Sequence, residues 1–378
     1  MALISNLWAY AVPFVVVLTV IVFVHEWGHY IIARVNGIRV ETFSIGFGRE
    51  LFGWNDRHGT RWKVALIPLG GYVKFFGDAN AVSMPGEMPL DLTPAERAVS
   101  FHYKPVWRRA AVVFAGPAAN FVFSTLVFAA LFAIIGQPFT PPVVGGVLPD
   151  TPAAAAGFHV GDRIVAVDGH SVERFQDLQM LIAFQAGVAL KVAIERDGAP
   201  LTLTVTPRRV ERKDGIGGPA KVGQIGIQST NKFEFVRRPP IEALWYGAHQ
   251  CAEIVQTTMT YLGGVAVGRE SGDSLSGPLG IARITGEVAR VGMADLIQLM
   301  AMLSVSIGLV NLFPIPVLDG GHLLFYAVEA IRGRPLGEKA QEYSFRLGLI
   351  VVLTVFVFAT WHDLIKTGIG PFLSGLFS

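Results

Sequence analysis

Two histidines and a glutamate form the most informative pattern in this chain, in the segment His25, Glu26, Trp27, Gly28, His29. On a helix, residues four positions apart project from the same face, so the two histidines could bind one zinc ion together. The glutamate between them could then act as the general base for a water molecule. This spacing predicts the active site of a zinc metalloprotease. Because such a match is weak evidence in an arbitrary globular chain, its surroundings decide how much weight it carries.

The surroundings of this motif are apolar. No charged side chain occurs from Trp8 to Val24, directly before the first histidine. Ionisable groups are costly in such a stretch and are functional candidates by default. The inert alternative, in which His25 and His29 are only structural, is therefore much less favoured. A second pair with the same spacing, His249 and Glu253, has no third partner nearby in the sequence and is interpreted as a solvated helix face.

A catalytic zinc ion usually has three protein ligands and a fourth position open to water. The third ligand is expected to be Asp319, in the segment from Asn311 to His322. Pro314 and Pro316 in this segment are expected to break a helix, and the two glycines that follow Asp319 are expected to let the chain turn. Irregular backbone at membrane depth is tolerated where it lines a wet cavity, which a hydrolase requires.

Three polar side chains near these positions have roles that the sequence leaves open. The amide of Asn311 could hold the substrate backbone or polarise the scissile carbonyl group. His322 could reach the zinc site, although a role in orienting a ligand or a purely structural role is at least as well supported. Asn120 could line the wet cavity or only bond a neighbouring helix, and neither interpretation is favoured.

Composition places the chain in a membrane. Of its 378 residues, 52% are hydrophobic and 16% are charged, against about 25% charged in an ordinary soluble domain. The net charge of +2 suggests no nucleic-acid partner, and the single cysteine, Cys251, excludes an intramolecular disulfide. Four stretches approach the roughly 20 residues that cross a lipid bilayer. They are Trp8 to Arg34, Ala110 to Ile135, Leu296 to Leu318 and Leu347 to Trp361.

Basic residues near the ends of these spans predict the orientation of the chain. None precedes Trp8, and many lie between the first and second spans and between the third and fourth. They include Arg39, Arg49, Arg57, Arg61, Lys63, Lys74, Arg97, Lys104, Arg108, Arg332, Arg334, Lys339 and Arg346. Both connections are therefore expected in the cytoplasm, with the termini and residues 137–295 outside. The histidine motif and Asp319 then meet at the cytoplasmic ends of two spans.

Several segments, which occur in the same order as in the family, resemble the site-2 proteases, in particular the bacterial regulator-of-sigma-E protease type. Besides the histidine motif, they are Phe43 to Gly48, Ile67 to Lys74, Lys104 to Arg109, Ala115 to Asn120 and Asn311 to His322. The resemblance implies a zinc-dependent intramembrane endopeptidase of the bacterial inner membrane. It also implies substrates that are single-pass membrane proteins, such as anti-sigma factors or signal-peptide remnants, cleaved in regulated intramembrane proteolysis. One difference is a single PDZ module, where the best-known family member has two.

The PDZ module is expected on the periplasmic side, at about Pro142 to Glu211. Its strand-like and helix-like segments are Val143 to Val147, Gly161 to Gly169, Phe175 to Gln185, Leu190 to Arg196 and Leu201 to Val205. Such a module could add a peptide C-terminus or an unfolded segment to a sheet edge, or it could be a spacer that only shields the active site. Arg208 to Ala220 is interpreted as a flexible exit. Ile241 to Val267 is interpreted as an amphipathic helix on the outer membrane face.

The predicted fold is an α-helical polytopic membrane protein with about four transmembrane helices, a membrane-associated β-hairpin and an inserted PDZ domain of the α+β class. We divide it into four parts. Residues 1–136 form the N-terminal catalytic half, and residues 137–212 form the PDZ domain. Residues 213–293 are a linker with the amphipathic helix, and residues 294–378 form the C-terminal half with the third zinc ligand.

The β-hairpin is expected to bind substrate. A substrate helix must unwind, because hydrolysis needs an extended backbone whereas a membrane span bonds its backbone internally. Arg61 to Ile67 and Tyr72 to Phe76 are strand-like, and Pro68 to Gly71 is expected to join them as a turn beside the zinc ion. One free edge could pair with the substrate, or the hairpin could only pack against the helices. The expected substrate-binding residues are Gly70, Gly71, Tyr72 and Val73.

The sequence thus predicts a complete reaction. Zinc lowers the pKa of bound water towards about 7, and Glu26 takes a proton from this water and passes it to the leaving amine. Zinc, helped by Asn311, stabilises the oxyanion. Two other functions remain open. A membrane-tethered protease for soluble cytoplasmic chains would use the same chemistry, whereas a non-catalytic scaffold would have no use for Glu26.

Overall fold

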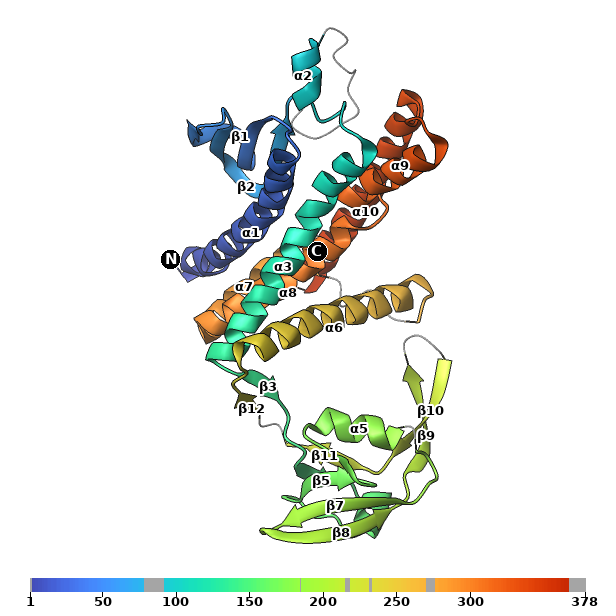
Figure 1. The fold of residues 1–378 in the computed structure, drawn as a ribbon. Helices are drawn as coiled ribbons and strands as arrows, with labels where there is room; N and C mark the ends of the chain where they lie inside the picture. Colours follow the sequence, from blue (N-terminus) through green and yellow to red (C-terminus); the bar gives the residue numbers. More distant parts are fainter. Residues whose placement is uncertain are drawn as a thin grey trace, which may run out of the picture. The chain divides into compact units, whose positions relative to one another are not determined.

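The computed structural model describes residues 2–77, 92–183, 185–214, 218–230, 233–269 and 276–366 (Figure 1). The chain forms two compact units. Unit 1 comprises residues 1–129, 244–258 and 271–378, and unit 2 comprises residues 130–243 and 259–270. The N-terminal and C-terminal parts of the chain therefore fold together, and unit 2 is inserted between them in the sequence.

Four helices are long and apolar enough to cross a membrane. They are α1 (Ala2–Val35), α3 (Val106–Ile134), α8 (Met293–Asn311) and α10 (Glu338–Lys366). These helices confirm the four predicted spans. The third predicted span ends early, at Asn311 rather than Leu318, because Pro314 and Pro316 lack the backbone N–H groups that would continue the helix.

Further helices include α2 (Pro94–Val99), α6 (Pro240–Ala266), α7 (Pro278–Val291) and α9 (Asp319–Arg332). Helix α6 confirms the helix predicted at Ile241 to Val267. Helix α7 lies where a linker was expected, and it packs closely on α1, since a Cβ atom on Gly286 would lie 2.1 Å from Cδ1 of Tyr10. The N–H of Gly280 in its first turn donates to Oδ2 of Asp363 in α10 at 2.8 Å. A side chain from another helix thus caps α7.

Unit 1 also contains a sheet formed by β1 (Val40–Asn55) and β2 (Arg61–Phe75), joined by Asp56 to Thr60. Pro68 to Gly71 lie inside β2, but the chain reverses there as predicted, because Arg61 to Val64 pair with Thr42 to Ile45 in the same direction and Gly71 to Lys74 pair with it in the opposite direction. The two predicted strands do not pair with each other, since Thr42 to Ile45 lies between them. Gly70 lies in this reversal with a φ of +123°, and it also serves a close approach. A Cβ atom on Gly70 would lie 2.5 Å from the ring of Phe47.

Each strand of this sheet reverses its direction midway, so the two strands together form four paired segments. Residues Thr42 to Ile45 are partners of Gly71 to Lys74 and also of Arg61 to Val64. The other half of β1, near Phe52 to Asn55, pairs with Arg61 to Val64 as well. Among the described residues, the stretch Gly71 to Lys74 is therefore paired with β1 on one side only, which leaves it at an edge of the sheet.

Unit 2 contains a four-stranded antiparallel sheet with the strand order β6-β5-β7-β8. Its elements are β4 (Val144–Val147), α4 (Pro152–Ala155), β5 (Arg163–Val167), β6 (His170–Ser171), α5 (Phe175–Ala183), β7 (Leu190–Arg196) and β8 (Ala199–Val205). They confirm the segments predicted for the PDZ module. Buried side chains of α5, such as Leu178 and Ile182, share one hydrophobic core with Ile164 and Val192 of the sheet.

Three further strand pairs extend unit 2 beyond the expected boundary at residue 212. They join β3 (Gln137–Phe139) to β12 (Glu234–Val236), β4 to β11 (Ile227–Ser229), and β9 (Arg208–Asp214) to β10 (Gly218–Gln224). The flexible exit predicted at Arg208 to Ala220 is therefore wrong, because continuous antiparallel pairing orders strands that are rich in charge and glycine. Ile225 also belongs to the core. We call residues 137–236 the module.

Candidate metal centre

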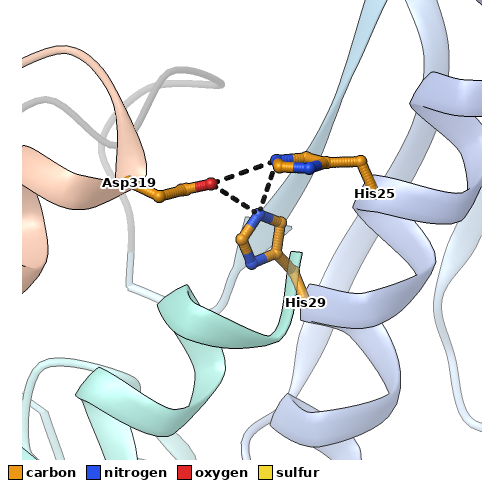
Figure 2. Close-up of side chains that lie close together, drawn as sticks. All are labelled: His25, His29 and Asp319. Carbon is orange, nitrogen blue, oxygen red and sulfur yellow. Dashed lines mark hydrogen bonds and ion pairs between the residues drawn. The ribbon is translucent and has the colours of Figure 1, made fainter. Parts of the chain in front are cut away.

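Three side chains converge in unit 1, two from α1 and one from the first residue of α9 (Figure 2). The two Nε2 atoms of His25 and His29 lie 3.3 Å apart. Oδ2 of Asp319 lies 3.1 Å from the first and 3.6 Å from the second. Ligands about 2.0–2.1 Å from a tetrahedral zinc ion lie about 3.3 Å from one another. The three atoms therefore have the spacing of one face of a zinc tetrahedron.

The chemistry of this donor set also fits a metal ion. The side chains of His25, His29 and Asp319 are 11%, 9% and 18% exposed, so the site is largely shielded from solvent. Oδ2 of Asp319 is buried, and none of the described residues donates a hydrogen bond to it. A buried carboxylate oxygen without a donor is costly unless a cation or another group faces it. A metal ion bound between the three atoms would satisfy it.

The end of α8 and the start of α9 deliver Asp319 to this place. Helix α8 ends at Asn311, and the intervening residues form short-range bonds, such as Ile315 N–H to the Phe313 carbonyl at 2.7 Å. Gly320 and Gly321 do not turn the chain as expected but lie in the first turn of α9. Their Cβ atoms would lie 2.2 Å and 2.4 Å from backbone oxygens of the preceding segment. They therefore let that segment cross α9 closely.

Helix α3 packs against the two histidines and orients His29. Nδ1 of His29 lies 2.9 Å from the carbonyl oxygen of Val112, to which it donates, and this leaves Nε2 free to bind a metal. A Cβ atom on Gly116 would lie 2.3 Å from Nε2 of His29 and 2.9 Å from Nε2 of His25. Only glycine leaves room at this position. Sequence reasoning missed both features, although the Gly116-Pro117 pair within an apolar helix was a signal for the second.

The remaining predicted site residues line one cavity of about 320 Å³ together with the triad. The structure brings there Glu26, Asn311 and His322, and also Gly70, Gly71, Tyr72 and Val73. The backbone N–H of Val73 donates to the Glu26 carboxylate. The base, the candidate metal ligands and the edge of β2 therefore face the same space, as a peptide hydrolase needs.

Hydrogen bonds to Asp56 connect the hairpin to α1. Asp56, in the hairpin turn, accepts bonds from Tyr30 Oη at 3.0 Å, Trp62 Nε1 at 3.1 Å and the N–H groups of His58 and Thr60. Burial alone would raise the pKa of Asp56, but these donors outweigh it and lower the pKa to about 2. Because Tyr30 directly follows His29, the turn is anchored beside the metal ligands.

A second tie, which sequence reasoning missed, joins α3 to α9. Nη2 of Arg109 donates to Oε1 of Glu329 at 2.6 Å, and both side chains are largely buried. The guanidinium group of Arg109 also lies 4.9 Å from the ring centre of Tyr326. Since α9 begins with Asp319, this buried pair fixes the helix that carries the third candidate ligand. No local pattern indicates a contact between residues so distant in the sequence.

Comparison with known proteins identifies relatives along almost the whole chain. The sequence model of peptidase family M50 matches residues 13–355. A protein of Rhizobium meliloti described as a candidate zinc metalloprotease is 47% identical, and the match covers 96% of this chain and 99% of the relative. Metalloprotease MmpA of Caulobacter vibrioides is 43% identical, covering 96% and 97%. A candidate zinc metalloprotease of Rickettsia conorii is 34% identical, covering 93% and 98%.

Solved structures match only part of the chain. The PDZ domain of an SdrC-like protein from Listeria innocua is 25% identical and covers 24% of this chain and 96% of its own, with a TM-score of 0.20. The corresponding domain from Listeria monocytogenes is 22% identical and covers 25% and 90%, with a TM-score of 0.21. At such scores, the description of the module depends on its own strands and helices.

Proposed function

Since this chain belongs to peptidase family M50 and is a zinc metalloprotease with membrane-spanning helices, we propose that it cleaves the transmembrane segments of single-pass membrane proteins. The observation that carries this proposal is the position of the candidate catalytic groups. His25, Glu26 and His29 lie inside the apolar helix span Trp8–Val35 and not in a domain outside the membrane. A peptide bond that reaches them must enter at membrane depth.

In this proposal, His25, His29 and Asp319 hold the zinc ion. The chemistry that zinc supplies when bound is Lewis-acid polarisation of the attacking water and of the scissile carbonyl group. Glu26 accepts a proton from the water and transfers it to the leaving nitrogen. The side-chain amide of Asn311 donates a hydrogen bond to the carbonyl oxygen as negative charge develops there. All of these residues line the same cavity.

The edge of β2 offers hydrogen bonds to an unwound substrate. Residues Gly71 to Val73 line the cavity, and in the part of the chain that the structure describes they are paired with β1 on one side only. Because Val73 directs its N–H towards Glu26, alternate residues of this stretch point their backbone groups towards the active site. An extended substrate segment paired to this edge would lie beside the general base. Strand pairing thus replaces the hydrogen bonds that the substrate helix loses.

A synthetic single-span substrate in lipid bilayers tests the proposal. Cleavage inside the span, located by mass spectrometry and absent with Glu26→Gln protein, is the expected result. Replacing single backbone amides near the scissile bond by esters should lower kcat/KM at every second position, because alternate amides of a paired strand face its partner. Cleavage only in flanking soluble segments would instead favour the membrane-tethered protease. Complete absence of zinc-dependent cleavage, with every span tried, would favour the scaffold.

We propose further that the active site opens towards the cytoplasm of a bacterial inner membrane, with the module in the periplasm. The distribution of Lys and Arg between the spans supports this orientation. Natural substrates of this kind are anti-sigma factors already shortened by another protease, or signal-peptide remnants. Cysteine accessibility to a membrane-impermeant reagent, at Ser5→Cys and at Gly337→Cys, distinguishes the two sides. Labelling of Gly337→Cys from outside intact cells would contradict the orientation.

The module is proposed to restrict access, either by binding a peptide end or by excluding bulky substrates. Its two ends are adjacent, because Phe139 pairs with Glu234. Residues 140–233 can therefore be replaced by an Asn-Gly turn that closes β3 onto β12. The shortened protein should still cleave a trimmed substrate and should now also cleave untrimmed ones. Loss of cleavage of every substrate in a correctly inserted, zinc-loaded protein would contradict the proposed restriction.

A further inference from the structure

Asn120 of α3 is fully buried, at 0% exposure, and it contacts a candidate zinc ligand. Its Nδ2 atom lies 3.3 Å from Nδ1 of His25, the ring nitrogen that faces away from Asp319 and His29. The sequence left its role open between the wet cavity and a contact with a neighbouring helix. A hydrogen bond to Nδ1 of His25, the ring nitrogen that does not face the metal site, is a third possibility.

The proton on the ring decides how this contact works. A histidine that binds zinc through Nε2 carries its proton on Nδ1, and this N–H group needs an acceptor. His29 satisfies the rule, since its Nδ1 faces the Val112 carbonyl oxygen at 2.9 Å. For His25 the neighbouring group is the amide of Asn120, whose nitrogen is a donor and cannot accept a proton.

The buried oxygen of the same amide resolves this mismatch. Oδ1 of Asn120 is buried and has no hydrogen-bond partner among the residues that the structure describes. The two ends of an asparagine amide have nearly the same shape, and hydrogen-bond partners decide which end lies where. A half-turn of the amide gives Oδ1 to the Nδ1–H group of His25. This rotation gives the buried Oδ1 atom a donor. It also removes the unfavourable contact between the two donors, Nδ2 of Asn120 and the Nδ1–H group of His25.

We propose that Asn120 is a positioning residue that accepts the Nδ1 proton of His25 through Oδ1 and so directs Nε2 of that histidine towards zinc. The proposal concerns the metal ligand itself and does not depend on which substrates the enzyme cleaves. In this arrangement α3 orients both histidines, one by the Val112 carbonyl group and the other by a side-chain amide.

The structure of α3 around Asn120 is suited to this task. Gly116 lets the helix approach the two Nε2 atoms, and Pro117 has no N–H group to bond the carbonyl group four residues earlier. The backbone oxygen of Asn120 accepts bonds from Ser124 Oγ at 2.8 Å and from Ser304 Oγ of α8 at 3.2 Å. The backbone that carries the amide is therefore held from two helices.

Two substitutions with opposite hydrogen-bonding properties test the proposal. Asn120→Asp keeps an acceptor and has no donor, whereas Asn120→Leu has a similar shape and neither function. We expect the leucine variant to bind zinc about 10- to 100-fold more weakly, as other losses of such partners do, and the aspartate variant to bind zinc at least as tightly as the native protein. Affinity is measured on the full chain in detergent by competition with a chromophoric zinc chelator.

Thr125→Val is the matched control, because it removes a polar group from the same helix. The hydroxyl group of Thr125 contacts Cys251 of α6 and none of the metal-site residues. Its zinc affinity should match that of the native protein. If Asn120→Asp weakens binding more than about tenfold, Asn120 acts as a donor or only packs, and the proposal is wrong. Native affinity in Asn120→Leu would contradict it equally.

A spectroscopic measurement separates positioning from folding. In protein loaded with Co²⁺, the visible absorption bands report the ligand arrangement at the metal. The bands should keep their native positions in Asn120→Asp and shift in Asn120→Leu. If the leucine variant does not fold, the aspartate variant alone decides, since a donor role predicts loss of zinc affinity and shifted bands there. Neither readout involves a substrate, so failure of the proposed cleavage specificity would leave both unchanged.

Discussion

The two compact units bury different kinds of side chain. The described core of the module is almost entirely apolar, with Val144, Ile164, Leu190 and Val192 at 0% exposure. Its one buried charged residue, Asp162, is held by Arg196 through bonds of 2.7 Å and 2.8 Å. The other buried polar side chains that the structure describes all belong to unit 1. They are His25, His29, Ser44, Thr60, Ser100, Asn120, Ser124, Thr285, Ser304 and Asp363.

This difference separates folding from function. An apolar core such as that of the module stabilises a fold and carries no chemistry of its own. Polar groups in an apolar span are costly, so they persist where they bind something or bond each other. In unit 1 five of them lie at or next to the triad, since His25, His29, Asn120, Ser124 and Ser304 form a connected set of contacts. We therefore expect substitutions at the contacts of the metal site to change zinc binding, and substitutions in the buried core of the module to change its stability.

The largest effects are expected in unit 1, where substitution of the general base and substitution of a metal ligand should have different consequences for zinc content. Glu26→Gln should lower kcat by about 10²–10⁴-fold, because the general base is lost, while zinc content stays near native. Asp319→Ala should lose activity and much of the zinc, because one of three ligands is removed. Metal content by mass spectrometry and cleavage of one substrate are measured together. Equal zinc loss in the two variants would mean that Glu26 is itself a ligand.

The next effect compares glycines in two helices. In Gly116→Ala, the new methyl group would lie 2.3 Å from Nε2 of His29, so either α3 or the histidine must shift and zinc affinity should fall. Gly263→Ala in α6 is the control, because no atom of the described residues lies within 4 Å of its Cβ position. It should stabilise that helix by about 0.5–1 kcal/mol. Native zinc affinity in Gly116→Ala would show that the close approach of α3 is dispensable.

The same comparison explains what the sequence could predict. In the module, β7 alternates buried and exposed residues, and the period of two in Leu190 to Arg196 predicted it correctly. In unit 1, the spacing of His25 and His29 predicted one half of the metal site, and the motif around Asp319 predicted the other. These signals are local, because a helix or strand repeats its geometry along the chain.

Other features depend on contacts between distant segments, which no local pattern reveals. The Val112 carbonyl group that faces His29 is a backbone acceptor, and every residue has one. Gly70, with a φ of +123°, indicated the reversal within β2, but its close approach to the ring of Phe47 was not predictable from the sequence. The β9–β10 pair was missed because composition suggested flexibility, whereas pairing between Arg208 to Asp214 and Gly218 to Gln224 orders it.

A smaller effect is expected at the edge of β2. Because Val73 directs its N–H to Glu26, Tyr72 and Lys74 direct theirs towards β1. Proline at Val73 should lower cleavage by roughly tenfold, equivalent to one hydrogen bond of about 1.4 kcal/mol, and proline at Tyr72 or Lys74 should disrupt the hairpin. Alanine at the same positions should be mild. Helix-breaking residues near the scissile bond should partly restore cleavage by Val73→Pro, and the absence of both alternation and recovery would exclude strand pairing.

The smallest effect on activity is expected in the module, at its buried charge. Burial alone would raise the pKa of Asp162, but bonds from Arg196 and the His159 N–H outweigh it and hold the pKa below its usual value. The folded state thus binds this proton less tightly than the unfolded state, so the stabilisation is present above about pH 4 and is lost as pH falls through the folded pKa. Asp162→Asn should remove this dependence and lower the free energy of unfolding by about 1.5–3 kcal/mol at neutral pH.

Urea unfolding of the full chain, followed through the methyl NMR signals of Ile164 and Ile194, measures the stability of the module at each pH. Glu173→Gln is the matched control, because it makes the same change on an exposed residue of the module and should leave unfolding unaltered. Zinc affinity and cleavage of a trimmed substrate should stay native in both variants, since the hydrogen bonds described for the Asp162 carboxylate all come from groups of unit 2. Loss of zinc in Asp162→Asn would show that the two units depend on each other, and the separation of stability from chemistry would then be wrong.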